Sequence, residues 1–242
     1  GLAGLVIFDK KGPRPVPPRD PGQEARPIAP AGAVDWPADT PVNAWTDARM
    51  PLQWLWVGPF PNPEDQPFDA LAGAGGWEQA RLKPGQVIQH AGVERTVAAF
   101  DSEHFFQREE QPNLELMIPT RKAYHSTNYF YTVIQVAQPV TVRFTDHING
   151  CKASYRLNGH DLASGDFVTL QPGRHVLIAR AHLYKINDWG KAWFRPTFTQ
   201  VDEATMQAGL RELRVRYLLD KARYEEELAY WQATDGASPH YN

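Results

Sequence analysis

The sequence has little cysteine, little net charge and no long apolar run. Its single cysteine, Cys151, excludes an intramolecular disulfide and any zinc site built from several cysteines. A formal net charge of −3 over 242 residues gives no basic footprint for nucleic acid. No apolar stretch approaches the roughly 18 residues of a membrane-spanning helix. We therefore expect no nucleic-acid partner, and membrane contact only through an anchor or another protein.

Catalytic motifs are also missing. There is no Gly-x-Ser-x-Gly elbow, no His-Glu-x-x-His pair and no phosphate-binding loop in the sequence. Tyr124, His125, Asn128 and Tyr129 could supply the tyrosine and histidine of a polysaccharide lyase, with a phenol as general acid and the imidazole as base. Their spacing does not require that chemistry. We therefore expect no catalytic residues, no metal and no cofactor, and we keep a small lyase as the least favoured alternative.

Proline, by contrast, is abundant near the start of the chain. Ten of the 21 prolines fall within residues 12–51. Because proline fixes φ and lacks an N–H, we expect residues 1–51 to form an extended arm without regular structure. An arm this poor in apolar side chains does not order by itself, so Trp36 or Trp45 should contact the chain's own domain or a partner. The apolar run 2–8 is either the end of a signal or membrane anchor, or a packed strand.

Residues 52–199 show the period-two pattern of β-strands. Val140, Val142 and Phe144 alternate with polar neighbours, and Asn158-Gly159 supplies the positive φ values of a tight hairpin turn. We expect Gly58-Pro59 to end an apolar edge strand. Short strands separated by turn signals, with no helical period between them, predict a mainly β fold, either an antiparallel β-sandwich or a barrel.

Residues 200–242 change to helical spacing. Over residues 202–232 one apolar stripe recurs along the predicted helix, and it consists of Leu210, Leu213, Tyr217, Tyr224, Leu228 and Trp231. At 1.5 Å per residue the helix would be about 45 Å long. Its second half therefore either packs on the chain's own sheet or passes the edge of the domain, where Tyr224, Leu228 and Trp231 would contact another protein subunit.

The order of several segments resembles a known kind of module. These segments are Trp54–Asn62, Trp77, Tyr129–Thr132, Tyr155–Gly159 and Leu170–Ile178. Together they resemble the jelly-roll accessory modules of bacterial secreted glycan-active proteins, which are similar to galactose-binding-like domains and to protective-antigen-type lectin sandwiches. The resemblance implies a jelly roll, a carbohydrate-binding-like surface, and a periplasmic or extracellular location that includes the option of membrane association.

The resemblance breaks down where such modules often carry an acidic segment for calcium or sugar. Here the stretch Thr145–Cys151 has a single carboxylate, Asp146, whereas calcium takes six to eight oxygen ligands. We therefore expect no inherited metal or sugar site. Trp189, next to Asn187 and Asp188 in a predicted loop, is instead the best candidate for an exposed contact with a sugar ring or a partner side chain.

Three functions remain open. The first is a non-catalytic structural subunit of a periplasmic or membrane-associated assembly, which binds other subunits through the N-terminal arm and the C-terminal helix. The second is a carbohydrate-binding module of a larger polysaccharide-degrading enzyme, with a glycan as partner. The third is the small lyase.

Overall fold

A computed structural model describes residues 12–32, 35–45, 53–64, 66–100, 105–108, 111–117, 125–184, 192–234 and 236. The chain divides into two compact units. One unit comprises residues 25–203 and holds all the strands that the structure describes. The other combines the described residues up to Glu24 with those from Ala204 onward, and holds the helix. The mainly β class and the single C-terminal helix that the sequence predicts are confirmed.

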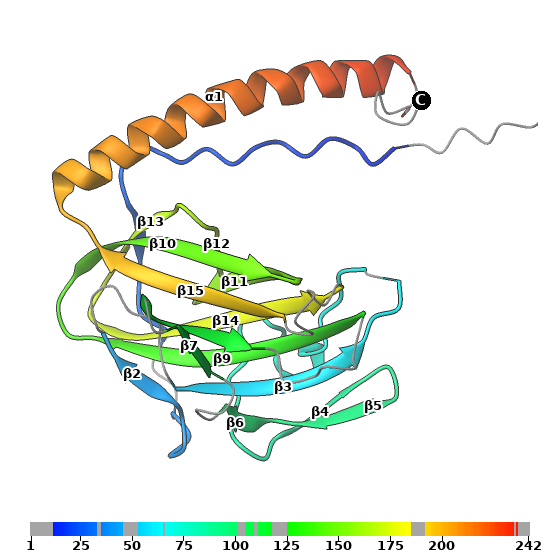
Figure 1. Cartoon of the computed structure of the whole chain (residues 1–242), viewed down its shortest axis with the longest axis vertical. Coiled ribbons are helices and arrows are strands. Elements are labelled where there is room, and N and C mark those ends of the chain that lie inside the picture. Colours follow the sequence, from blue (N-terminus) through cyan, green and yellow to red (C-terminus); the bar gives the residue numbers. More distant parts are fainter. Residues whose placement is uncertain are drawn as a thin grey trace, which may run out of the picture. The chain divides into compact units, whose positions relative to one another are not determined.

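The strand unit contains two large sheets with antiparallel central pairings (Figure 1). The six-stranded sheet has the order β1 (Arg26–Ile28), β13 (Phe167–Leu170), β10 (Val140–Asn149), β15 (Trp193–Gln200), β8 (Gln111–Met117), β7 (Phe105–Arg108). The seven-stranded sheet has the order β12 (His160–Leu162), β11 (Cys151–Leu157), β14 (Gly173–Leu183), β9 (Ser126–Val136), β3 (Trp54–Pro61), β6 (Ala98–Phe100), with β2 (Val42–Ala44) paired to β9.

An inner core fills the space between the two sheets. Phe144 of β10 and Phe198 of β15 come from the six-stranded sheet, and Phe130 of β9 and Leu177 of β14 come from the other. All four side chains are fully buried. Each buried side chain of this size stabilises the fold by about 1.5–3 kcal/mol, so the sandwich needs no disulfide.

An outer core covers the opposite face of the seven-stranded sheet. Tyr129, Tyr131 and Val133 of β9 point away from the inner core, as the period of two requires. They pack against the segment 68–97, which contains the short helix η1 (Ala72–Ala74) and the hairpin of β4 (Val87–His90) and β5 (Val93–Thr96). Strand β9 is therefore buried on both faces.

The turn at Asn158-Gly159 is confirmed. Asn158 has a φ of 48° and Gly159 a φ of 81°, and they join β11 to β12 in an antiparallel hairpin. The prediction for Gly58-Pro59 is wrong. Strand β3 continues through this dipeptide to Pro61, because a register shift between Val57 and Phe60 accommodates the irregular residues. It lies between β9 and β6 in the sheet.

The expectation of an arm without regular structure over residues 1–51 is wrong for its second half. β1 and β2 lie within it and pair in parallel with β13 and β9. Pro27 is compatible with β1 because that strand forms the edge of its sheet, where a missing N–H is tolerated. Residues 12–24 carry no helix or strand.

Candidate functional site

The apolar stripe predicted on the terminal helix is a covered surface. Helix α1 runs from Glu203 to Ala233. Leu210 is buried, and the other stripe members are half-buried, namely Leu213, Tyr217, Tyr224, Leu228 and Trp231. Met206, one turn before Leu210, is also buried. The side chains proposed as partner contacts at the end of the helix are thus partly shielded.

Residues 12–24 lie along this helix in the opposite direction, as Figure 1 shows for the blue segment. The Trp231 indole N–H donates to the Gly12 carbonyl at 3.1 Å, and the Gly12 N–H donates to the Gly236 carbonyl at 2.8 Å. Nearer the start of the helix, Arg214 donates to both carboxylate oxygens of Asp20 at 2.8 Å. The Gly22 N–H and Arg214 together lower the pKa of Asp20.

The distances between these anchors fit an extended proline-rich segment. From Trp231 back to Arg214 the helix advances about 26 Å, at 1.5 Å per residue. From Gly12 to Asp20 a polyproline-type chain advances about 25 Å, at about 3.1 Å per residue. The first part of the arm is therefore ordered by the helix of its own chain.

A second apolar face of α1 is exposed. Its large side chains are Val215, Leu218, Leu219 and Tyr230, which are 61%, 51%, 68% and 41% exposed. Successive helix residues are 100° apart, which places this face almost opposite the covered stripe. This face was not predicted from the sequence, although Val215, Leu219 and Ala222 have the required spacing of three and four residues.

Two of the predicted aromatic contacts lie on the strand unit's own cores. Trp36 is half-buried against the outer core, with the guanidinium groups of Arg81 and Arg174 over its ring at 5.5 and 5.3 Å from the centroid. Trp45 is half-buried against the inner core, and its backbone N–H donates to the Gln135 carbonyl at 2.9 Å. Both residues fasten the segment that precedes β3 to the sandwich.

The predicted contacts Asn187, Asp188 and Trp189 lie outside the described residues. Next to them in sequence, Tyr184 follows β14 and is 41% exposed. His182 stacks near its ring, with centroids 6.5 Å apart, and the Lys152 ammonium lies 5.3 Å from the ring centroid. An exposed aromatic ring beside a cation and an imidazole can stack on a sugar.

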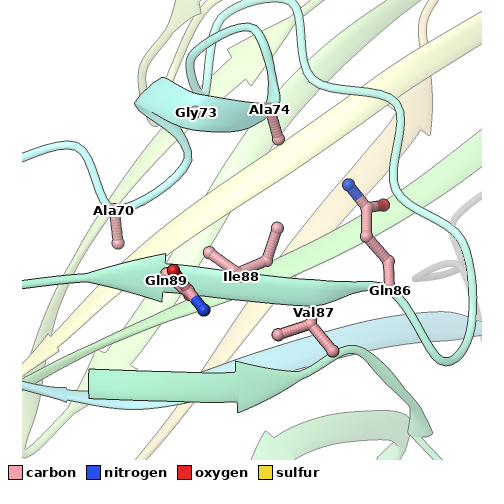
Figure 2. A pocket seen from close by; sticks show the side chains of 7 residues that line it. All are labelled: Ala70, Gly73, Ala74, Gln86, Val87, Ile88 and Gln89. Atoms are coloured by element: carbon pink, nitrogen blue, oxygen red, sulfur yellow. The ribbon is translucent and has the colours of Figure 1, made fainter. Parts of the chain in front are cut away.

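A surface pocket of about 470 Å³ lies between the loop around η1 and strand β4 (Figure 2). Small, aliphatic and amide side chains line it: Ala70, Gly73, Ala74, Gln86, Val87, Ile88 and Gln89. The amide of Gln86 accepts from the Lys83 N–H, and that of Gln89 donates to Glu94. With no charged or aromatic side chain in its lining, the pocket has no group for acid–base chemistry and no stacking surface.

Two of the residues considered for a lyase, Asn128 and Tyr129, make structural contacts. Tyr124 lies outside the described residues. The Tyr129 hydroxyl accepts from the Ala70 N–H at 2.9 Å and donates to the Phe68 carbonyl at 3.0 Å, and burial raises its pKa to about 12. Asn128 is fully buried and accepts from the Trp56 indole at 3.1 Å. These contacts make Tyr129 and Asn128 structural residues.

Asp146 is a carboxylate whose surroundings change its pKa strongly. Burial raises its pKa to about 6, beside the Tyr155 phenol and the Cys151 thiol, whose own pKa burial raises to about 12. A high thiol pKa leaves Cys151 protonated and unreactive at neutral pH. Within the described part of the chain, no group of three or more acidic, histidine or cysteine side chains is placed to hold a metal ion.

Replacing Asp146 by Asn should stabilise the protein at pH 7. The folded state binds this proton more tightly than the unfolded chain, so wild-type stability from this group falls as the pH rises from about 4 to about 6. The Asn variant does not titrate at this position. Its free energy of unfolding should exceed that of the wild-type protein by about 1–3 kcal/mol at pH 7 and by little at pH 4. Urea unfolding of both proteins at the two pH values measures the difference, and an equal difference at both would contradict the assignment.

Comparison of the chain with protein-family models, with curated proteins and with solved structures finds no match. Among the described residues, no helix combines the length and the apolar character needed to cross a bilayer.

Proposed function

We propose that this chain is a non-catalytic interaction module: a jelly-roll sandwich of the glycan-associated accessory type, joined to an assembly element. That element consists of residues 12–24 and helix α1. In this proposal the chain is a structural subunit of a periplasmic or membrane-associated bacterial assembly, and its partners are other protein subunits. The compartment follows from the resemblance in sequence order alone.

The pairing of the strands supports the jelly-roll part of the proposal. The last eight strands pair in nested fashion, each pair antiparallel: β8 with β15, β9 with β14, β10 with β13, and β11 with β12. Consecutive strands along this series mostly alternate between the two sheets. A long hairpin that is rolled up on itself has this order, and it is the organisation of a double-sheet jelly roll.

The exposed face of α1 is the observation that carries the interaction part. A helix that served only as a lid would need one apolar face, and that face is already occupied by residues 12–24. Val215, Leu218 and Leu219 are each more than half exposed on the other side. Clustered large apolar side chains in water favour aggregation, so a protein retains them where a partner covers them.

Removal of residues 221–242 tests this proposal in cells that produce the protein. The truncated chain loses Trp231 and the part of the exposed face beyond Leu219, which includes Tyr230, but keeps every strand that the structure describes. We expect its sandwich to unfold in the same temperature range as before, while the assemblies that contain it become smaller on size analysis.

A matched control lacks only residues 237–242 and keeps both the helix and the Gly12–Gly236 contact. It should assemble like the intact chain. If the larger truncation unfolds the sandwich, the helix is part of the fold, and if it leaves the assemblies unchanged in size, the removed segment does not hold them together. Either result contradicts the proposed function.

Tyr184 favours glycan binding as a second candidate function. Its exposed ring, with Lys152 and His182 beside it, provides a stacking surface that the pocket at β4 lacks. A glycan array separates the two functions. Binding that disappears in Tyr184→Ala supports glycan binding, and binding to none of the glycans supports the structural subunit.

A further inference from the structure

The exposed face of α1 has a residue order that is complementary to itself. From the start of the helix onward, the face carries Ala208, Arg211, Val215, Leu218, Leu219, Ala222, Glu226 and Ala229, all of them exposed. The basic residue comes before the two leucines and the acidic residue after them. Arg211 precedes the midpoint between Leu218 and Leu219 by the same number of residues as Glu226 follows it.

We infer that this face binds the same face of a second copy of the chain, in an antiparallel helix pair with its two-fold axis between Leu218 and Leu219. The inference rests on the proposed interaction function and names its partner. A two-fold interface uses the same surface patch of both copies, so each contact occurs twice.

The antiparallel register brings matching groups together. Leu218 lies at the level of Leu219 of the second copy, and Val215 at the level of its Ala222. Arg211 comes within reach of its Glu226, and the symmetry repeats each contact. Ala208 and Ala229 also meet, and these small side chains allow the helices to approach within the usual 8–10 Å.

Charge decides the direction of the pair. A parallel pair in register would place Arg211 opposite a second Arg211 and Glu226 opposite a second Glu226, and like charges in contact are unfavourable. The antiparallel pair replaces both repulsions with attractions. One helix face per copy is a small interface, which corresponds to a weak dimer.

Sedimentation of the full chain tests this inference, at concentrations from about 5 to about 200 µM, where weak dimers become populated. The intact chain should change from monomer to dimer over this range. Arg211→Glu and Glu226→Arg should each weaken the dimer about tenfold, which equals about 1.4 kcal/mol, because each substitution replaces two attractions with two repulsions.

The double variant with Arg211→Glu and Glu226→Arg should recover the affinity of the intact chain to within about threefold, because the exchanged charges again attract. Leu219→Glu should abolish dimerisation in this range. Lys83→Glu, an equal charge reversal at an exposed position of the strand unit, should leave the dimer unchanged. Circular dichroism of each variant confirms that the helix is still formed.

A chain that stays monomeric throughout, or a double variant no better than the single variants, would overturn the inference. The proposed function fails separately. If the purified chain is monomeric while a cross-linker at position 219 captures a different protein in cells, the second copy is the wrong partner and the interaction function is still supported. If position 219 contacts nothing, both are wrong.

Discussion

Replacing His175 by Leu is expected to lower the free energy of unfolding by about 3–5 kcal/mol. His175 is fully buried at the start of β14, and both of its ring nitrogens are hydrogen-bonded. Its Nε2–H donates to the Gln171 carbonyl at 2.6 Å, so its Nδ1 accepts from the Asn158 amide at 3.0 Å. Leucine fills a similar volume but makes neither hydrogen bond, so the Gln171 carbonyl and one N–H of the Asn158 amide lose their His175 partner, and each such loss costs about 1–3 kcal/mol.

Thermal and urea unfolding measure this loss, which corresponds to a fall in Tm of roughly 6–15 °C for a chain of this size. His160→Leu is the matched control, because His160 is exposed in β12, and it should change the free energy of unfolding by less than about 0.5 kcal/mol. Equal effects of the two substitutions would show that the His175 contacts do not hold the turns together.

The same histidine should make stability depend on pH. Burial lowers the pKa of His175 below its ordinary value of 6.5, so the folded state keeps the ring neutral while the unfolded chain takes up a proton. The contribution of His175 to the free energy of unfolding is therefore fully present above about pH 7 and decreases as the pH falls below 6.5. The His175→Leu variant should lack this part of the wild-type pH dependence.

Replacing Gly58 by Ala is the second change with a large expected effect, a loss of about 3 kcal/mol or more. A Cβ at this position would lie 2.5 Å from Oδ1 and 3.2 Å from Cα of Asn128. Asn128 cannot move aside because it is fully buried and accepts the Trp56 indole hydrogen bond. The φ of 153° at Gly58 adds strain for any side chain.

Gly32→Ala is the control, since nothing lies within 4 Å of a Cβ there. It should alter the Tm by no more than about 2 °C. If Gly58→Ala melts at the same temperature as this control, the close approach of β3 to Asn128 is not maintained in solution.

The elements with strong local patterns were predictable from sequence. The alternation at Val140–Phe144 corresponds to β10, and the Asn158-Gly159 turn lies between β11 and β12. The helix predicted over 202–232 is observed as Glu203–Ala233. In each case the signal is contained in the segment itself, as an alternation of one buried and one wet face or as the φ requirement of a turn.

The elements that depend on distant neighbours were not predictable. Strand β9 is buried on both faces by the inner and outer cores, so its residues Ser126–Val136 show no period of two. The strands β1 and β2 are three residues each and exist because β13 and β9 offer them an edge. The residues of β1 and β2 contain no local pattern that predicts such a pairing.

The candidate site was predictable only in part. The stripe that ends in Tyr224, Leu228 and Trp231 was correctly placed on one helix face, but its cover by residues 12–24 depends on contacts across the whole chain, such as Arg214 with Asp20. The opposite face is present in the sequence as Val215 and Leu219. It can be identified as a surface for a partner only when the structure shows that residues 12–24 cover the first face.

The most direct test of the central claim is site-specific cross-linking from the exposed helix face in cells that produce the protein. A photoreactive residue in place of Leu219 is compared with one in place of Lys83, which is exposed on the strand unit. We predict a discrete cross-linked product from position 219 and none from position 83. No product from position 219, or equal products from both positions, would contradict the claim that this helix face is where the protein makes its contacts.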